Sequence, residues 1–458
     1  MIENDAFKLL LINLFHLNPD DITNIVCTTF NKMMVLLVTL ADKHQACPYC
    51  GFTAPKIKEY VTKEITHSAL TTQKCIIKYR ARRYKCSCCG KTYYEFNPFV
   101  FKSQKISILT VHNILKDLKD FNETFTSVAR RYHVSPTSVS TIFDNHVDIG
   151  RNPLPEIINF DEVYAFKSEK SKYVCVLLDF KKQIPVDVLP NRKKEYLLNY
   201  FQKIPLEERK KVKYACSDMY EVYRDVVHKV FPEAKHLLDY FHLSQDFHKK
   251  MNEVRIKVMK GYKDNKASDE YYLLKKFNWL LFKNPEDEDK YGRLFDVERE
   301  RKYNSHFKSY MNYYDLRKKI LEINNDLTIC YSLKLELVDF YSKSTIDNAQ
   351  VNLEHLIRSC IDTNIEEMIA FSNNLINWKQ EIINSFTIVG TEYKVEADKG
   401  QVVVCNKKVN NAIIENRNKI IKCIKNNANG YTNWSRFRNR VMYVLDPNAT
   451  FSLEPREK

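Results

Sequence analysis

Three carboxylates that lie far apart in the chain, Asp161, Asp218 and Glu415, have the clearest potential for chemistry. The aspartates lie in or directly after short β-branched runs that predict buried strands, and Glu415 lies on a basic segment that predicts a helix. Two ionised aspartates on neighbouring strand ends repel each other unless a divalent ion lies between them, and oxygen ligands favour Mg²⁺ or Mn²⁺. We therefore expect a metal site of the kind that cuts phosphodiester bonds. The plainer alternative is that each aspartate caps the turn that follows it.

The residues around the two aspartates predict a sheet that could bring them together. Three consecutive apolar runs are spaced as antiparallel strands, and a helix, a fourth strand, a second helix and a fifth strand follow. This is the order of an RNase H-like α/β domain, in which the first and fourth strands are central neighbours and reactive groups gather outside the strand ends. The expected strands span 154–166, 172–180, 183–190, 212–218 and 234–242, and the expected helices span 193–204 and 221–231.

Two other acids compete for the aspartate positions. Glu162 adjoins Asp161, but consecutive strand residues point to opposite faces, so only one of the two can face Asp218. Asp239 ends the fifth strand, close to His242 in the sequence, and could also lie near the site. We favour Asp218 as the second acid, because the strand beside the first one is expected to be the fourth and not the fifth.

The predicted helix around Glu415 has two distinct faces, one apolar and one that joins an acid to cations. The apolar stripe comprises Ile413, Ile420 and Ile424, and the polar face comprises Glu415, Lys419 and Lys422. Glu415 and Lys419 also fit an ordinary surface pair at i,i+4 spacing, although the neighbouring Asn411 and Asn418 are less usual.

Two CxxC pairs predict a second, structural metal site. Each pair brings two thiolates to one ion, and the glycine after it lets backbone N–H groups turn toward the sulfurs. We expect one Zn²⁺ ion, because four unconnected thiols in a reducing compartment would explain neither the double spacing nor the glycines. Cys88 could compete with Cys86 as a ligand. The expected ligands are Cys47, Cys50, Cys86 and Cys89, and the glycines are Gly51 and Gly90.

Residues 106–147 predict three short helices in the order of a helix-turn-helix. Ser135 followed by Pro136 is a strong start signal for the third helix. We expect outward side chains of this helix and two arginines at the turn to contact DNA, with an ordinary three-helix core as the alternative. These side chains are Thr137, Ser138, Thr141, Asn145, Arg130 and Arg131.

Size and charge indicate a multidomain protein that binds a polyanion. The chain has 458 residues, of which 44% are apolar, so two to four domain cores are expected. Lysine and arginine number 72 against 57 acids, and a net charge of +15 favours nucleic acid as the partner. The longest apolar run, 33–41, is shorter than the roughly 20 residues of a membrane span. Because the N-terminus also lacks the basic region of a signal peptide, we expect a cytoplasmic protein with no membrane partner.

Taken together, these motifs resemble those of the DDE transposases of bacterial insertion sequences, of the ISL-three family type. The resemblance covers nearly the whole chain and rests on CPYCG, CSCCG, the helix-turn-helix, FDEVYAF, SDMYEVYRD, LLDYFH and NNAIIENRNKIIKCIK. It implies that Asp161, Asp218 and Glu415 form the acidic triad of an enzyme that recognises element ends, cleaves strands and transfers them. One departure precedes the glutamate: the family usually has Ser-Asn-Gly or Ser-Asn-Ala, where this chain has Asn410, Asn411 and Ala412.

The expected fold class is a multidomain α+β chain in which a catalytic domain is interrupted. The long segment between Asp218 and Glu415 shows helical apolar spacing, which predicts a mostly α-helical insertion, and residues 386–408 predict a hairpin before the glutamate helix. The expected boundaries are 1–100 for a zinc-ribbon-like domain, 101–150 for the helix-turn-helix, 151–243 and 401–446 for the two parts of an RNase H-like domain, 244–400 for the insertion and 447–458 for a frayed tail.

The mechanism that the resemblance implies uses two Mg²⁺ (or Mn²⁺) ions to clamp the scissile phosphate and to activate first water and then a 3′-hydroxyl. Lys419 and Lys422 would hold phosphates, while Arg192, Lys193 and Lys194 would steer the DNA. The implied partners are double-stranded DNA, as element ends and as target, and a second copy of the chain in a synaptic homodimer at the bacterial nucleoid. The alternatives are a DNA-binding protein without catalysis, either a regulator or an inactive remnant, and a structure-selective nuclease of the same fold.

Overall fold

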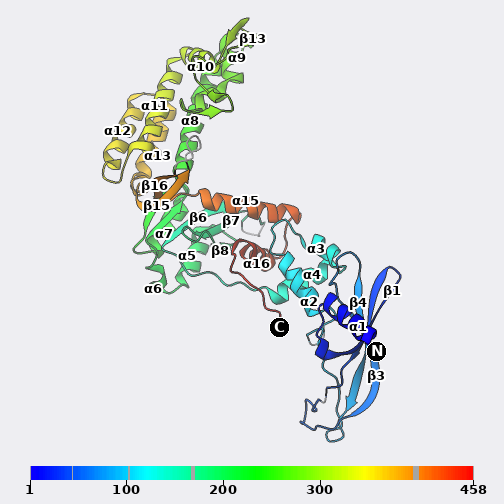
Figure 1. Ribbon diagram of the computed structural model, residues 1–458. Coiled ribbons are helices and arrows are strands. Elements are labelled where there is room, and N and C mark those ends of the chain that lie inside the picture. Colours follow the sequence, from blue (N-terminus) through cyan, green and yellow to red (C-terminus); the bar gives the residue numbers. More distant parts are fainter. Residues whose placement is uncertain (1, 44, 102–103, 167–170, 396–401, 457–458) are drawn as a thin grey trace.

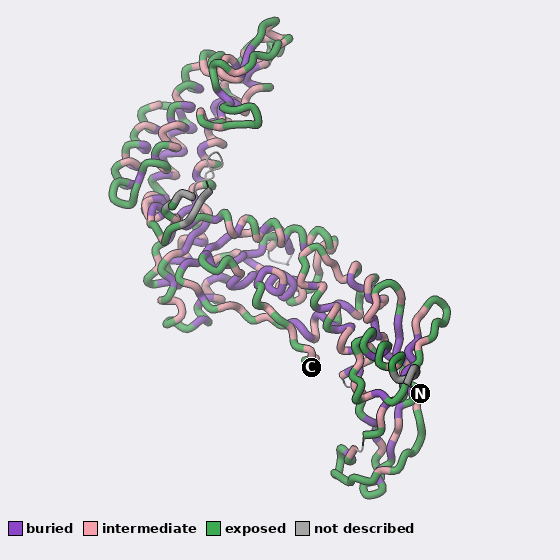
Figure 2. The backbone as a smooth tube through the Cα atoms, viewed as in Figure 1, coloured by how far each residue is buried: buried purple, intermediate pink, exposed green. Residues whose placement is uncertain are grey.

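The chain forms an elongated, mixed α+β molecule with three lobes (Figure 1). The middle lobe contains the central sheet, with a β-rich lobe at the N-terminal end on one side of it and a mostly helical lobe on the other. The computed structural model describes residues 2–456 except 44, 102–103, 167–170 and 396–401. Buried residues run through the central sheet and along the inner faces of the long helices (Figure 2). No helix in these described ranges is both long enough and apolar enough to cross a membrane.

A β-rich lobe forms the N-terminal end, which we call the N-terminal lobe. Helix α1 (Ile2–Leu14) packs on a sheet with the strand order β1-β2-β4-β3, and β5 pairs with β4. The segment between the CxxC pairs forms two long antiparallel strands, β3 and β4. The strands are β1 (Ile22–Phe30), β2 (Met33–Leu40), β3 (Lys56–Thr66), β4 (Cys75–Lys85) and β5 (Thr92–Tyr94).

Three short helices follow where the sequence predicts them: α2 (Ile108–Asp117), α3 (Phe125–Arg131) and α4 (Pro136–His146). The hydroxyl of Ser135 accepts a hydrogen bond from the Ser138 N–H at 3.0 Å, as expected of the residue that caps α4. The short connection between α3 and α4 lets both helices share one small apolar core.

The C-terminal segment that begins at Pro447 was expected to be frayed, and this prediction is wrong for its described residues. Ser452 and Arg456 donate backbone hydrogen bonds to carbonyls of α4, each at 3.0 Å, and the Phe451 ring packs edge-on against His112 of α2. The segment therefore lies against the three-helix unit, because the end of α4 offers carbonyls with no partner inside the helix.

The central sheet has the strand order β10-β9-β6-β7-β8. The first strand, β6, pairs in antiparallel fashion with β7 and in parallel with β9, so the predicted central neighbourhood of the first and fourth strands is confirmed. These strands are almost fully buried, which explains why their sequences are continuous apolar runs. They are β6 (Ile157–Val163), β7 (Val174–Asp179), β8 (Pro185–Leu189), β9 (Tyr214–Ser217) and β10 (Lys235–Leu238).

Helices cover both faces of the central sheet. Phe160 and its neighbours pack against α5 (Lys194–Gln202) and α7 (Glu221–Val230), while Val176 packs with the helices of the other face. Those helices are α15 (Ala412–Asn427) and α16 (Trp434–Leu445), which follow the insertion in the sequence. The short helix α6 (Leu206–Arg209) precedes β9.

The segment between β10 and α15 is mostly helical, as predicted, and we call it the helical lobe. Two small two-stranded pairs were not anticipated: β11 (Glu288–Asp289) with β12 (Gly292–Arg293), and β13 (Lys302–Asn304) with β14 (Ser309–Met311). The hairpin before the glutamate helix is present as β15 (Ile388–Val395) and β16 (Val402–Lys408), although residues 396–401 lie outside the described part. The helices are α8 (Tyr240–Lys260), α9 (Asp269–Lys276), α10 (Tyr313–Glu322), α11 (Asn325–Lys343), α12 (Ala349–Asp362), α13 (Glu366–Asn377) and α14 (Lys379–Asn384).

The buried face of helix α15 differs in part from the one predicted. Ile424 of the predicted stripe is buried, but Ile413 and Ile420 are only partly buried, and Ile414, Asn418 and Ile421 are buried as well. The register differs because Ile413 packs toward β9 and β10 while the next turns pack over β6 and β7, so the helix contacts two apolar surfaces.

Helix α16 ties the three-helix unit to the central sheet through one buried cation. Arg440 is 1% exposed, and its Nη2 donates to the backbone carbonyls of Asp120 at 2.8 Å and of Glu123 at 2.7 Å. Removal of a buried donor leaves such carbonyls without a partner, which costs about 1–3 kcal/mol for each group.

We predict that Arg440→Met lowers the free energy of unfolding by about 2–3 kcal/mol, because the Asp120 and Glu123 carbonyls lose their donor. Urea denaturation followed by circular dichroism measures the change. The matched control is Arg130→Ala, which removes an exposed arginine of the adjacent α3 and should change stability by less than about 0.5 kcal/mol. Equal effects of the two substitutions would show that the buried contacts of Arg440 do not stabilise the fold.

Candidate functional site

Three aspartates lie in register at the same end of three adjacent parallel strands. Asn159 of β6 pairs with Cys216 of β9, which brings Asp161 and Asp218 to matching positions. Leu238 of β10 pairs with Ser217 of β9, so Asp239 lies beside Asp218 in the same way. We call these three aspartates, together with Glu415 in the first turn of α15, the acid site.

His242 lies at the centre of the acid site. From the sequence it was expected only to be a neighbour of Asp239. The Nε2 atom of His242 is 2.6 Å from Asp218 Oδ1, 3.9 Å from Asp239 Oδ2 and 4.0 Å from Glu415 Oε1. When it is protonated, His242 is therefore a cationic partner of Asp218. The sequence pattern that could have predicted the position of His242 is the spacing Asp239-x-x-His242, which puts both residues on one face at the start of α8.

Buried asparagines of α15 hold the aspartates in place. Asn411 Nδ2 donates to Asp218 Oδ1 at 3.1 Å, and the Asn411 backbone N–H donates to Asp239 Oδ1 at 3.4 Å. About two turns further on, Asn418 Nδ2 donates to Asp161 Oδ2 at 2.6 Å. Asn411 and Asn418 were noted in the sequence, but no role was predicted for them. Asn159 was not noted, and its Nδ2 donates to Asn411 Oδ1 at 2.7 Å.

Burial and the nearby negative charge make Asp161 and Asp239 reluctant to ionise. Burial, followed by the nearby charge of Asp218, raises the pKa of Asp161 to about 7. Burial also raises the pKa of Asp239 to about 6, although His242 opposes this shift. Burial disfavours the charge on His242, but its contact with Asp218 outweighs burial and raises the pKa of the imidazole above its usual 6.5. The acid site therefore attracts cations.

Glu162 does not belong to the acid site. Its carboxylate forms an ion pair with Arg192, whose guanidinium lies 4.6 Å from the centre of the Tyr173 ring and 4.9 Å from that of Tyr220. Asp161 and Glu162 thus point to opposite faces of β6, as the alternation of strand residues requires. Arg192, predicted to steer DNA, has its charge paired within the protein.

A groove of about 620 Å³ opens beside the acid site, between the end of β10 and the helical lobe. Asp239 and Glu415 line it on one side, and Lys408 adds a cation. Phe241, which is 51% exposed, projects at its border. The acid site can therefore be reached from outside the protein.

The other residues predicted to contact DNA lie on two separate parts of the molecule. Lys419 and Lys422 are exposed on α15, and Lys193 is exposed at the start of α5. On the three-helix unit, Arg130, Thr137 and Thr141 are exposed, while Ser138 and Asn145 are half-buried. Arg131 forms ion pairs with Asp117 and Glu123.

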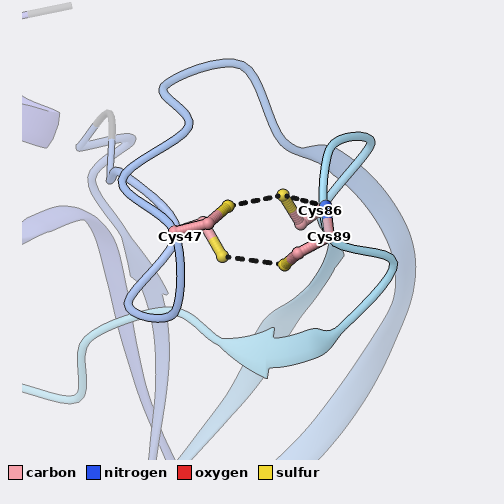
Figure 3. Close-up of side chains that lie close together, drawn as sticks. Cys47, Cys86 and Cys89 are labelled. Atoms are coloured by element: carbon pink, nitrogen blue, oxygen red, sulfur yellow. Dashed lines mark hydrogen bonds between the residues drawn. The ribbon is translucent and has the colours of Figure 1, made fainter.

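The four cysteines of the CxxC pairs converge in the N-terminal lobe (Figure 3). The sulfur atoms of Cys47 and Cys89 are 3.7 Å apart, and those of Cys50 and Cys86 are 3.5 Å apart. Sulfurs at about 2.3 Å from a tetrahedral Zn²⁺ ion would be roughly 3.8 Å apart, so the cluster could hold zinc. The backbone N–H of Cys89 lowers the pKa of Cys86 to about 7, which favours the thiolate.

The two CxxC turns have the same backbone geometry. Gly51 and Gly90 have φ values of 73° and 71°, the left-handed conformation that glycine adopts without strain. Each donates its N–H to the carbonyl of the first cysteine of its pair, at 2.9 Å to Cys47 and 3.0 Å to Cys86. Cys88 is exposed and does not belong to the cluster of four.

Comparison with known proteins connects the acid site to a family. The pattern that defines the ISL3 type of DDE transposases, described as transposase, matches residues 158–397. The transposase for insertion sequence element IS1001 of Bordetella parapertussis is 19% identical over 409 residues, which cover 89% of this chain and 90% of that protein. The matched range contains Asp161, Asp218, Asp239 and His242 but ends before Glu415.

The raised pKa of His242 generates a pH-dependent prediction. The contact of His242 with Asp218 contributes its full stabilisation at pH values below about 6.5, the pKa of histidine in the unfolded chain. This stabilisation is lost as the pH rises through the higher pKa that His242 has in the folded protein. In Asp218→Asn we expect the His242 pKa to fall to 6.5 or below, because the opposite charge is gone and burial remains. NMR titration of isotope-labelled histidines in the presence of EDTA measures it, and His242→Gln identifies the signal.

The matched control for this titration is Asp246→Asn on the same helix, where Asp246 accepts a hydrogen bond from Asn374 at 2.8 Å. This substitution should leave the His242 pKa unchanged. A His242 pKa below 6.5 in the parent protein, or one that Asp218→Asn does not lower, would contradict the proposed contact.

Proposed function

The chain belongs to the transposase family of the ISL3 DDE type, and from this premise we propose that it is the transposase of an insertion sequence. It would bind the ends of its element and catalyse metal-dependent DNA strand cleavage and strand transfer. The observation that carries the proposal is the convergence of Asp161, Asp218 and Glu415 at one end of three parallel strands. The family match does not extend to Glu415, so its assignment rests on its position 4.0 Å from His242, which in turn contacts Asp218.

The acid site fits a pair of divalent cations. Its ligand atoms are carboxylate oxygens, which suit Mg²⁺ or Mn²⁺. Asp239 Oδ2 is buried with no hydrogen-bond partner among the described residues, so the site has an uncompensated acceptor as well as repelling charges. We assign two Mg²⁺ (or Mn²⁺) ions to Asp161, Asp218 and Glu415. When bound, such ions would stabilise the attacking and leaving oxygens of the phosphodiester and lower the pKa of the attacking water.

The protein's own contribution to the reaction is orientation. Asn411 and His242 both contact Oδ1 of Asp218, so the other oxygen of that carboxylate stays available as a ligand. In Asp161, Oδ2 accepts from Asn418 and Oδ1 accepts from the Glu162 backbone N–H at 2.7 Å, so its orientation is held from both sides and a metal ion would use a remaining lone pair. Because the Asn411 and Asn418 amides come from the helix that carries Glu415, the three proposed ligands are positioned by one rigid element. His242 can compensate the negative charge of the site when fewer cations are bound.

Asp218 is favoured over Asp239 as the second ligand by its exposure. The Asp218 side chain is 21% exposed, whereas that of Asp239 is 5% exposed and accepts the Asn411 N–H at the start of α8. Asp218 also lies at the end of β9, directly beside β6 and Asp161, whereas β10 and Asp239 are one strand further away. We therefore assign Asp239 to the support of His242 and α15.

Two surfaces would bind DNA. The exposed Arg130, Thr137 and Thr141 of the three-helix unit would recognise the element end in the manner of a helix-turn-helix, with Ser138 and Asn145 at the edge of that surface. Lys419, Lys422 and Lys193 would contact backbone phosphates near the acid site. Arg131 and Arg192 would have to break their ion pairs with carboxylates of the protein before they could bind phosphate. We therefore assign them a smaller contribution to DNA binding.

We propose the domain boundaries expected from the sequence. The strand order β10-β9-β6-β7-β8, with β9 parallel to β6 and β7 antiparallel to it, supports an RNase H-like domain in two parts, at 151–243 and 401–446. The zinc-ribbon-like domain, the helix-turn-helix and the helical insertion would occupy 1–100, 101–150 and 244–400. Joining two element ends requires a homodimer in synapsis.

We predict that Asp161→Asn, Asp218→Asn and Glu415→Gln each reduce Mg²⁺-dependent strand cleavage by roughly 10²- to 10³-fold, the scale of losing one preorganised charged group. The substrate is a plasmid carrying the DNA that brackets the reading frame, and gel electrophoresis measures nicked and joined products. Binding of the same DNA in a gel-shift assay should persist, because the DNA-recognition surface lies on the three-helix unit.

Glu162→Gln is the matched control for these variants, since Glu162 adjoins Asp161 but faces Arg192. It should leave cleavage within a few-fold of the parent. Full activity in all three acid variants would reject the triad, and activity in Asp218→Asn with loss in Asp239→Asn would make Asp239 the second ligand. A parent protein that binds the DNA and never cleaves it would be a DNA-binding regulator, and one that cleaves without joining would be a nuclease.

We also propose that the four-cysteine cluster holds one structural Zn²⁺ ion, and predict that Cys86→Ser removes it. Loss of one thiolate should lower zinc content from one ion per cluster toward none and should destabilise the N-terminal lobe, because binding free energy of such an ion is part of its folding free energy. A colorimetric zinc assay on the purified protein measures the content. Cys88→Ser, two positions along the same turn, should keep the ion; if it loses zinc and Cys86→Ser does not, Cys88 is the ligand.

A further inference from the structure

A second group of metal-ligating side chains lies outside the acid site, where the central sheet meets the helical lobe. It comprises His228 at the end of α7, His236 on β10 and Glu381 on α14, whose ligand atoms all lie within 4.8 Å of one another. We call it the His-His-Glu cluster. His236 is 2% exposed and Glu381 is 5% exposed, while the His228 side chain is 56% exposed and borders solvent.

The hydrogen bonds of His236 determine which of its ring nitrogens carries a proton. Ser217 Oγ donates its single proton to the Asp218 carbonyl at 2.9 Å. The contact of 2.9 Å between Ser217 Oγ and His236 Nε2 can therefore form only if Nε2 carries the proton and donates. In a neutral ring this leaves Nδ1 with a free lone pair, and burial lowers the pKa of His236 to about 3, which keeps the ring neutral.

That lone pair has no partner in the described protein. His236 Nδ1 is buried without a hydrogen bond among the described residues and points toward the carboxylate of Glu381, 3.9 Å away. The Glu381 side chain is 6% exposed, its nearest cationic groups among the described residues are the two histidines, and His228 Nε2 lies 3.9 Å from the same oxygen. A cation between two acceptors that face each other in a buried place would stabilise both of them.

We propose that the His-His-Glu cluster binds one Zn²⁺ ion through His228 Nε2, His236 Nδ1 and a carboxylate oxygen of Glu381. Two imidazoles and a carboxylate are ligands that zinc accepts, with water in the fourth position, and the exposed side of His228 admits it. Ligand atoms at about 2.0–2.1 Å from a tetrahedral ion would be roughly 3.4 Å apart, so the 3.9 Å spacings must close by about half an ångström. A small rotation of the exposed His228 and of Glu381 achieves this.

The ion would join the helical lobe to the sheet end that carries the acid site. Asn384, in the same helix as Glu381, already donates its Nδ2 to the His236 carbonyl at 2.9 Å. Ser217, which accepts the His236 N–H, directly precedes Asp218. A histidine that binds a metal through one nitrogen and donates from the other is held in one orientation. The zinc site is independent of the four cysteines and of strand transfer itself.

The test is zinc content of the full-length protein, measured by mass spectrometry after dialysis against limited Zn²⁺ with excess Mg²⁺ to occupy the acid site. We expect one more zinc ion per chain in the parent than in Glu381→Gln. His228→Gln should weaken the affinity of this ion at least tenfold without disturbing the fold, because His228 is largely exposed. Co²⁺ at the same site should give visible absorption without thiolate charge transfer, which separates it from the cysteine cluster.

Glu367→Gln is the matched control, because Glu367 is a similarly buried carboxylate of the helical lobe, 9% exposed, that pairs with Lys257 and not with histidine. It should keep the parent's zinc content. Equal zinc content in the parent, Glu381→Gln and His228→Gln would overturn the proposal and leave the cluster as a buried histidine–glutamate ion pair. Because the readout is the number of bound ions, loss of DNA cleavage by itself does not affect the outcome.

Discussion

The repulsion between carboxylates at the ends of three parallel strands is the constraint on which the rest of the structure depends. The register of β6, β9 and β10 puts Asp161, Asp218 and Asp239 side by side, and burial makes the charges of Asp161 and Asp239 costly. Such an arrangement is stable only if donors or cations surround it. His242 and the asparagines of α15 supply part of this compensation from within the chain.

The long insertion between β10 and α15 is compatible with this constraint because α15 returns to the sheet that carries the aspartates. After the helical lobe, α15 covers the open face of the sheet and contributes Asn411, Glu415 and Asn418 over little more than two turns. The hairpin β15–β16 leads directly into this helix. The length of the insertion therefore affects the acid site only through contacts at its two ends, and the His-His-Glu cluster lies at such a contact.

The three-helix unit and the central sheet are joined by several polar contacts. Arg440 of α16 bonds two carbonyls of the three-helix unit, Arg436 of the same helix pairs with Asp144 at 2.5 Å, and Tyr443 Oη donates to the Leu115 carbonyl at 2.9 Å. The C-terminal segment adds backbone bonds to α4. A connection of this kind would set the distance between the recognised DNA sequence and the scissile phosphate, as site-specific cleavage requires.

The sequence alone determined the features that depend on local pattern. Apolar runs and turn residues predicted the strands and helices around Asp161 and Asp218, the adjacency of β6 and β9, the helical insertion and the two CxxC turns, because periodicity and glycine conformation are local properties. Only the tertiary structure decided which face of α15 meets the sheet, since Ile413 and Ile414 are equally apolar and the choice depends on two separate packing surfaces. The same is true of His242, Asn159 and the His-His-Glu cluster. Their partners are distant in the sequence, and no local spacing records which carboxylate a buried histidine will face.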